Sequence, residues 1–152
     1  MAATVFEGLE ELKGAVGQPL GHSDWLEVTQ ERVNQFAEAT GDHQWIHVDS
    51  DRAAKGPFGR TIAHGYLTLS LVSLLMPQMI QVRGVSMGIN YGTNKVRFPS
   101  PVPVGSMIRA SAQVLSVEDV PGGVQMTSLV TIEREGGDKP VCIVESVSRF
   151  LA

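Results

Sequence analysis

Residues 63–79 read AHGYLTLSLVSLLMPQM, and this stretch decides the predicted fold. Large apolar side chains occupy positions all around a helical wheel, and only short polar side chains interrupt them. A helix that lacks a polar face is buried by its surroundings. Pro77 should end or kink the helix, because its ring clashes with the preceding turn. The sequence therefore predicts one buried central helix with the rest of the chain around it.

The chain after this helix is predicted to form strands, from about residue 85 onward. Apolar and polar residues alternate with the period of two that is typical of a half-buried strand. Turns are expected at 121–123 and 135–138, and strands at 108–114, 124–133 and 140–151. Pro99, Pro101 and Pro103 interrupt a strand that begins near Asn94, which predicts a bend or a sheet edge there.

An amphipathic helix is predicted before the central one. Thr29 suits its N-cap, Phe36 lies on its apolar face, and Gly41 suits its C-terminal end. The sum is an α+β fold in one domain over residues 1–152, with an antiparallel sheet wrapped around a central buried helix. Because a single sheet has a bare outer edge, we expect a homodimer formed through sheet edges.

The composition excludes several classes of protein. The chain has 152 residues, 43% of them hydrophobic and 18% charged, which is an ordinary globular balance. A net charge of −4 argues against nucleic-acid binding. The longest apolar segment, 67–76, is too short to span a membrane, and no signal peptide is recognised. One cysteine, Cys142, forms no internal disulfide, so a cytoplasmic protein is expected.

The candidate site begins with Gly41-Asp42-His43-Gln44-Trp45-Ile46-His47. A spacing of five residues does not place Asp42 and His47 on one helix face, but it suits a loop in which both side chains converge. A carboxylate and an imidazole that share a water molecule can move protons near neutral pH. Asp42 can instead cap the turn after Gly41, and His43 is expected to be a solvated loop residue.

Three stretches together resemble the MaoC-like dehydratases, or R-specific enoyl-CoA hydratases, which adopt the hot-dog fold. The family pattern runs G-D-x-N-P-apolar-H, then H-G at the start of the central helix, and then R-F-x-x-P-V-x-x-G. The matching residues are Gly41-Asp42, Ile46-His47, His64-Gly65 and, within 97–105, Arg97-Phe98, Pro101-Val102 and Gly105. Gln44-Trp45 replaces Asn-Pro, and Ser106 stands where an aspartate is common.

The resemblance implies a lyase of fatty acid metabolism that interconverts trans-2-enoyl-CoA and (R)-3-hydroxyacyl-CoA. Asp42 and His47 would be catalytic, and which of them is the base stays open. The backbone N–H of Gly65 would stabilise the thioester oxyanion, where the helix dipole favours negative charge. No cofactor or metal is implied besides the acyl-CoA substrate, and no membrane partner is expected.

Four further residues each allow a functional and a structural interpretation. His64 and Ser73 could orient the catalytic pair or serve only the structure of the helix, where a serine can bond the carbonyl four residues back. Lys95 and Arg97 could bind CoA phosphates or form a solvated strand face.

Two other functions compete with the hydratase. The same fold hosts acyl-CoA thioesterases, and the departure at Gln44-Trp45 is compatible with a non-catalytic subunit that binds acyl thioesters. We expect Trp45 to narrow or reshape the acyl pocket. The acyl chain length and the carrier, CoA or acyl carrier protein, stay open.

Overall fold

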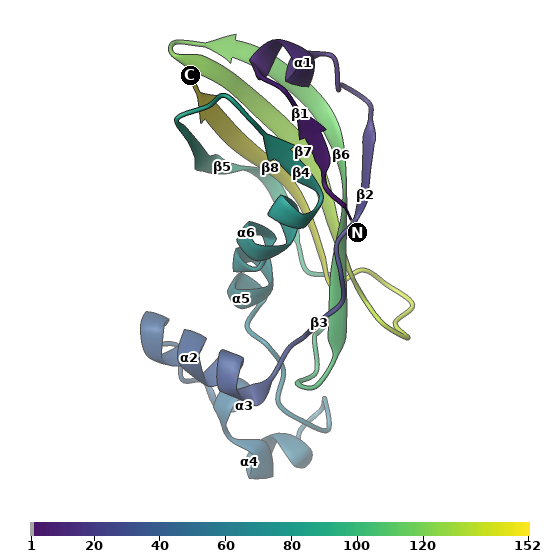
Figure 1. Ribbon diagram of the computed structural model, residues 1–152. Helices are drawn as coiled ribbons and strands as arrows, with labels where there is room; N and C mark the ends of the chain where they lie inside the picture. Colours follow the sequence, from purple (N-terminus) through teal and green to yellow (C-terminus); the bar gives the residue numbers. More distant parts are fainter. Residues whose placement is uncertain (1) are drawn as a thin grey trace.

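The computed structural model describes residues 2–152, which form a curved sheet with a short central helix against its concave side (Figure 1). The strands are β1 (Thr4–Phe6), β2 (Pro19–His22), β3 (Leu26–Glu27), β4 (Ile80–Val82), β5 (Met87–Arg97), β6 (Met107–Val120), β7 (Gly123–Arg134) and β8 (Cys142–Leu151). The helices are α1 (Leu9–Lys13), α2 (Gln30–Thr40), α3 (Trp45–Val48), α4 (Ser50–Ala54), α5 (Gly65–Ser70), α6 (Val72–Leu75) and the 3₁₀ turn η1 (Met76–Gln78).

The main sheet is antiparallel, and its strands lie in the order β2-β6-β7-β8-β5. The short strand β3 also pairs with β6, next to the segment that pairs with β2. The predicted α+β class is confirmed, and so are the strands expected at 108–114, 124–133 and 140–151, although the last one, β8, begins two residues later than predicted, at Cys142. One prediction was wrong: the strand expected to begin near Asn94 begins at Met87. Its first half is rich in glycine and asparagine, which have weak strand propensity, but pairing with β8 holds it extended.

A second sheet has two strands, β1 near the N-terminus and β4 directly after the central helix. β1 pairs in parallel with β4, with Val5 opposite Gln81. The sequence did not predict this sheet or α1, because each has too few residues to show a periodic pattern.

The central helix differs from the single buried helix that the sequence predicted. It is divided into α5 and α6 at Leu71, and it ends in η1, which contains Pro77. Leu67, Leu71 and Leu75 are buried against the sheet, whereas Tyr66 is 72% exposed. Within the single chain the helix is therefore covered on one side and open on the other. Of the described helices, none is long and apolar enough to cross a membrane.

The hydrophobic core fills the space between this helix and the sheet. Its fully buried members come from the helix and from the inner faces of the long strands: Leu75, Met79, Ile108, Val114, Met126, Val130, Ile132 and Val144. This core fixes the position of the helix, and so of the residues at its N-terminus.

The helix α2 begins and ends where its sequence predicts. The Thr29 side chain accepts a hydrogen bond from the Arg32 N–H, and Gly41 adopts a left-handed conformation with φ 80°. Only glycine adopts that conformation without strain, so the chain turns sharply after the helix. The residues that follow form α3 and α4, which lie with α2 at one end of the molecule (Figure 1).

Candidate active site

A buried segment, residues 61–64, connects the parts of the candidate site. All four residues are buried, and they lie directly before α5. The Ile62 N–H donates to the carbonyl of Ile46 in α3, and the Ala63 N–H donates to the carbonyl of Val102. Main-chain hydrogen bonds therefore tie α3 and the start of the central helix to one rigid strip of backbone.

His47 lies in α3 and is 6% exposed. Its Nδ1 lies 2.7 Å from the carbonyl oxygen of Ile62. Because a carbonyl oxygen can only accept, Nδ1 carries the proton and Nε2 keeps a free lone pair. Ile62 could not be found from the sequence, because its contribution is a main-chain atom.

The environment of His47 favours the neutral imidazole. Burial lowers its pKa below the ordinary value of 6.5, and the nearby His64 lowers it further. The hydrogen bond to Ile62 and the charge of Asp42 act in the opposite direction, but burial is the larger effect. A neutral imidazole with a free Nε2 is able to accept a proton at neutral pH.

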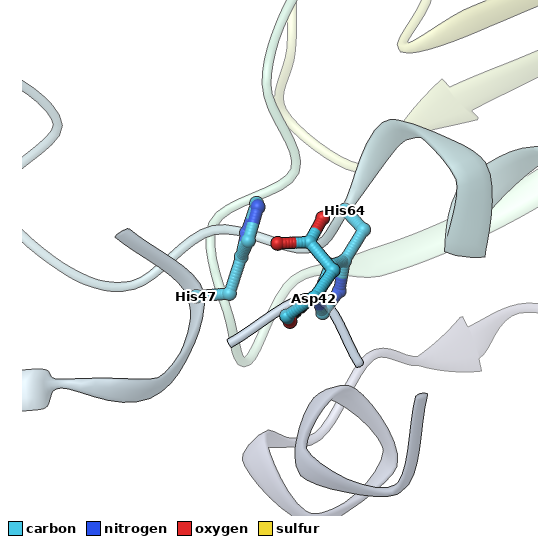
Figure 2. Close-up of side chains that lie close together, drawn as sticks. All are labelled: Asp42, His47 and His64. Atoms are coloured by element: carbon cyan, nitrogen blue, oxygen red, sulfur yellow. Dashed lines mark hydrogen bonds between the residues drawn. The ribbon is translucent and has the colours of Figure 1, made fainter. Parts of the chain in front are cut away.

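Asp42 leaves the end of α2 directly after Gly41, and its side chain is exposed. Its Oδ1 accepts a hydrogen bond from the Gln44 N–H at 3.3 Å, so it does cap the turn. Asp42, His47 and His64 each also contribute an atom to a cluster in which these atoms lie within 4.8 Å of one another. Figure 2 shows the Asp42 carboxylate directed toward the same space as the His47 imidazole. The structure therefore brings the carboxylate and the imidazole together.

His64 lies behind the pair and is 3% exposed. Its Nε2 donates to the main-chain carbonyl of Asp42 at 3.0 Å, and its ring stacks on the His47 ring with 3.9 Å between centroids. Stacked rings direct their nitrogen lone pairs within two nearly parallel planes. The three residues also carry ligand atoms of the kinds that bind metal ions, and these atoms lie close enough together to hold one.

Gly65 is the first residue of α5, so its N–H has no partner within the helix. It borders a pocket of about 370 Å³, whose lining is mostly apolar and includes His47. A Cβ on Gly65 would lie 3.1 Å from the Phe98 ring, which also lines this pocket. Gly65 and His47 therefore line one pocket, which is large enough for part of a ligand.

Trp45 packs outside the pocket that His47 and Gly65 line. Its ring lies 4.3 Å from the Arg52 guanidinium and packs against Gly56, and it is not part of the pocket lining. This position gives no support to the expectation that Trp45 narrows or reshapes the acyl pocket, which stays a prediction. Its neighbour Ile46 lines the pocket instead, because successive residues of a helix point in different directions.

Ser73 lies apart from Asp42 and His47. It is exposed on α6 and lines a second pocket, of about 310 Å³, whose lining contains neither of them. The bond to the carbonyl four residues back is made by Ser70, which donates to Tyr66. The structure therefore does not support an orienting role for Ser73 beside the catalytic pair.

Lys95 and Arg97 are exposed on β5, and neither lines these two pockets. Lys95 lies opposite Glu145 on β8, and Arg97 donates from Nη1 to the Val96 carbonyl. Their position agrees with a solvated strand face.

Comparison with known proteins identifies the family. The family model described as "MaoC like domain" matches residues 11–135. The chain is 57% identical to "3-hydroxyacyl-thioester dehydratase Z" of Mycobacterium tuberculosis, over 97% of this chain and 98% of that protein. It is 45% identical to "Nodulation protein N" of Rhizobium leguminosarum bv. viciae, over 87% of this chain and 84% of that protein.

A solved structure agrees with these matches in sequence. The (R)-hydratase from A. caviae involved in PHA biosynthesis superposes with a TM-score of 0.71 and 28% identity, over 88% of this chain and 94% of that one. The chain therefore belongs to the MaoC-like dehydratase family.

Proposed function

We propose that this chain is a hydro-lyase that interconverts trans-2-enoyl thioesters and (R)-3-hydroxyacyl thioesters, with acyl-CoA as the substrate. The observation that carries the proposal is the convergence of Asp42 and His47, together with the position of Gly65 in the lining of the same pocket as His47. A water molecule, a proton acceptor and an oxyanion donor are what hydration of an enoyl thioester requires. The similarity to a 3-hydroxyacyl-thioester dehydratase and to an (R)-hydratase supports it.

In the proposed mechanism His47 is the base. Its Nδ1 proton is bonded to Ile62, so Nε2 faces the reaction as a proton acceptor. The Asp42 carboxylate accepts a hydrogen bond from the attacking water and orients it. The water oxygen bonds to C3, Nε2 takes one water proton, and the thioester becomes an enolate whose oxygen accepts from Gly65. Nε2 then returns the proton to C2, which restores the enzyme and completes the addition of water. Elimination follows the same steps in reverse.

His64 is proposed as a positioning residue for both catalytic groups. Its bond to the Asp42 carbonyl holds the turn after α2, and its ring supports one face of His47. The electrostatic interaction between the two rings also contributes to the lowered pKa of His47. It makes these contacts from a buried position at the start of the central helix.

The chain is further proposed to act as a homodimer through the edge strand β5. Nearly all of its eleven residues are exposed, among them Met87, Ile89 and Tyr91. Long edge strands are rarely left open, because they pair with other chains. The exposed side of the central helix, with Tyr66 and Leu74, is also uncovered. Light scattering should give a dimeric mass, and Ile89→Lys should shift it toward the monomer.

A cytoplasmic location is proposed from the state of the cysteine. Cys142 is free and fully buried, and burial raises the pKa of its thiol to about 11. A free buried thiol is compatible with a reducing compartment.

The decisive experiment is to mix the pure protein with crotonyl-CoA and follow the loss of the enoyl-thioester absorbance. Longer-chain enoyl-CoA substrates and chiral analysis of the product then define the specificity. Asp42→Asn and His47→Ala should each nearly abolish turnover. His43→Ala is a matched control, because His43 is a nearby exposed histidine whose Nε2 lies 3.5 Å from the Glu38 carboxylate. No turnover with any chain length would refute the proposal. Release of free thiol would identify a thioesterase instead, and tight binding without turnover a non-catalytic subunit.

A further inference from the structure

Gln30, in the first turn of α2, contacts the main chain of the proposed base. Its Nε2 lies 2.8 Å from the carbonyl oxygen of His47, seventeen residues away. Its Oε1 accepts a hydrogen bond from the Thr61 hydroxyl, and Thr61 is 4% exposed. The two bonds fix the orientation of the amide, since the carbonyl can only accept and the Gln30 nitrogen can only donate.

The helix α3 needs such a contact. It has four residues, and an isolated helix of one turn is not stable in water. The carbonyls in the last turn of a helix have no partner within it, and His47 is the second-last residue of α3. Gln30 supplies a partner for that carbonyl from outside α3.

The contacts on His47 come from two adjacent residues of the buried segment 61–64. The imidazole Nδ1 is bonded directly to the Ile62 carbonyl. The main-chain carbonyl is bonded to Gln30, which in turn is held by Thr61. The ring and the backbone of one residue are therefore fixed against the same strip of backbone, which leaves little freedom in where Nε2 points.

We propose that Gln30, held by Thr61, is a positioning residue that sets the direction of His47 Nε2 for proton transfer. The proposal rests on the proposed function of His47 as the base. Gln30 is not part of the lining of the pocket that contains His47, so it acts through His47 and does not touch the substrate. Its loss should therefore lower kcat and leave KM nearly unchanged.

Three substitutions test this role. Gln30→Met keeps the length of the side chain and removes all three of its hydrogen bonds, those with His47, Thr61 and Asn34. Thr61→Val keeps its shape and removes only the bond to Gln30. Asn34→Ala is the matched control, because the exposed Asn34 accepts a hydrogen bond from the same Gln30 nitrogen but is not hydrogen-bonded to His47.

Gln30→Met should lower kcat about tenfold to a hundredfold, because a misplaced catalytic group costs rate on that order. Thr61→Val should lower kcat in the same direction, and the double variant should be no slower than Gln30→Met, because Thr61 acts through Gln30. Asn34→Ala should match the wild type. All rates are measured well below the unfolding midpoint of each variant.

Two results would overturn the proposal: a wild-type kcat for Gln30→Met, or losses in kcat that multiply in the double variant. A loss of thermal stability without a loss of kcat would mean that Gln30 serves only the fold. Nitrogen NMR of the His47 imidazole gives a second readout. Its signals should shift or broaden in Gln30→Met and stay unchanged in Asn34→Ala. This measurement tests the positioning even if the wild-type protein hydrates no enoyl-CoA, so the two proposals can fail separately.

Discussion

Adding one methyl group at Gly65 tests the proposed oxyanion site. A Cβ there would lie 3.1 Å from Cδ2 and Cε2 of Phe98 and 3.3 Å from Cγ. Carbon atoms that are not bonded prefer separations of about 3.5–4.0 Å, so the ring would have to retreat by roughly half an ångström. Phe98 is 40% exposed, which gives it room to move.

The cost of Gly65→Ala to folding should therefore be small. The backbone of Gly65 is not left-handed, so alanine brings no conformational strain. The gain from reduced freedom of the unfolded chain and the cost of the close contact should nearly cancel, within about 1 kcal/mol. A melting experiment should show a shift of a few degrees at most, since 1 kcal/mol corresponds to about 2–4 °C for a domain of about this size.

The cost to catalysis should be much larger. The new methyl group would stand beside the N–H that is proposed to donate a hydrogen bond to the thioester oxygen as negative charge develops there. Loss of one oxyanion donor costs about a hundredfold or more in rate, and we expect kcat to fall on that order. The assay is the disappearance of the enoyl absorbance of crotonyl-CoA, at saturating and at low substrate concentration.

A second substitution separates the two effects of the methyl group. Phe98→Leu removes the ring that the Cβ would meet, so the double variant should recover the stability of the wild type but not its kcat. Full turnover in Gly65→Ala would refute the reasoning, because the thioester oxygen could not then depend on this N–H. Recovery of kcat in the double variant would show instead that the methyl group acts only through Phe98.

Three other predictions follow from the structure. Burial lowers the pKa of His47, and a base must be neutral to accept a proton. As the pH is lowered, kcat/KM should therefore fall only at a pH below 6.5. A midpoint above 6.5 in the acid limb of the pH profile would contradict the assignment of His47 as the base. Trp45→Ala should leave the preference for acyl chain length unchanged, because Trp45 packs on Arg52 outside the pocket; a changed preference in a chain-length series would show that it does reach the substrate. Leu75→Ala should destabilise the protein by about 3 kcal/mol in a denaturant titration, since Leu75 is fully buried between the helix and the sheet, and a loss below 1 kcal/mol would mean that the core closes around the cavity.

The parts of the fold that were predicted from sequence rest on local interactions. Alternation in the strands, the Thr29 cap and the left-handed Gly41 are each set within a few residues. The start of β5 was predicted near Asn94, seven residues too late in the chain, because pairing with β8 overrides the weak strand propensity of its first half. The central helix was predicted to be covered on all sides, because an apolar pattern does not tell whether the same chain or a second one covers it.

By itself the sequence determined α2, the apolar central helix and three of the long strands after it, and it singled out Asp42 and His47 as candidates, because a helix that ends at Gly41 must release Asp42 at a fixed point. Only the tertiary structure decided how His47 is held. The Ile62 carbonyl lies fifteen residues from His47 in the sequence, and Thr61 lies thirty-one residues from Gln30. A local sequence pattern therefore predicts neither contact. Such contacts form when the sheet and the central helix pack together, and they involve main-chain atoms that every residue carries. The direction of Nε2, and with it the identity of the proposed base, is therefore a property of the packed molecule.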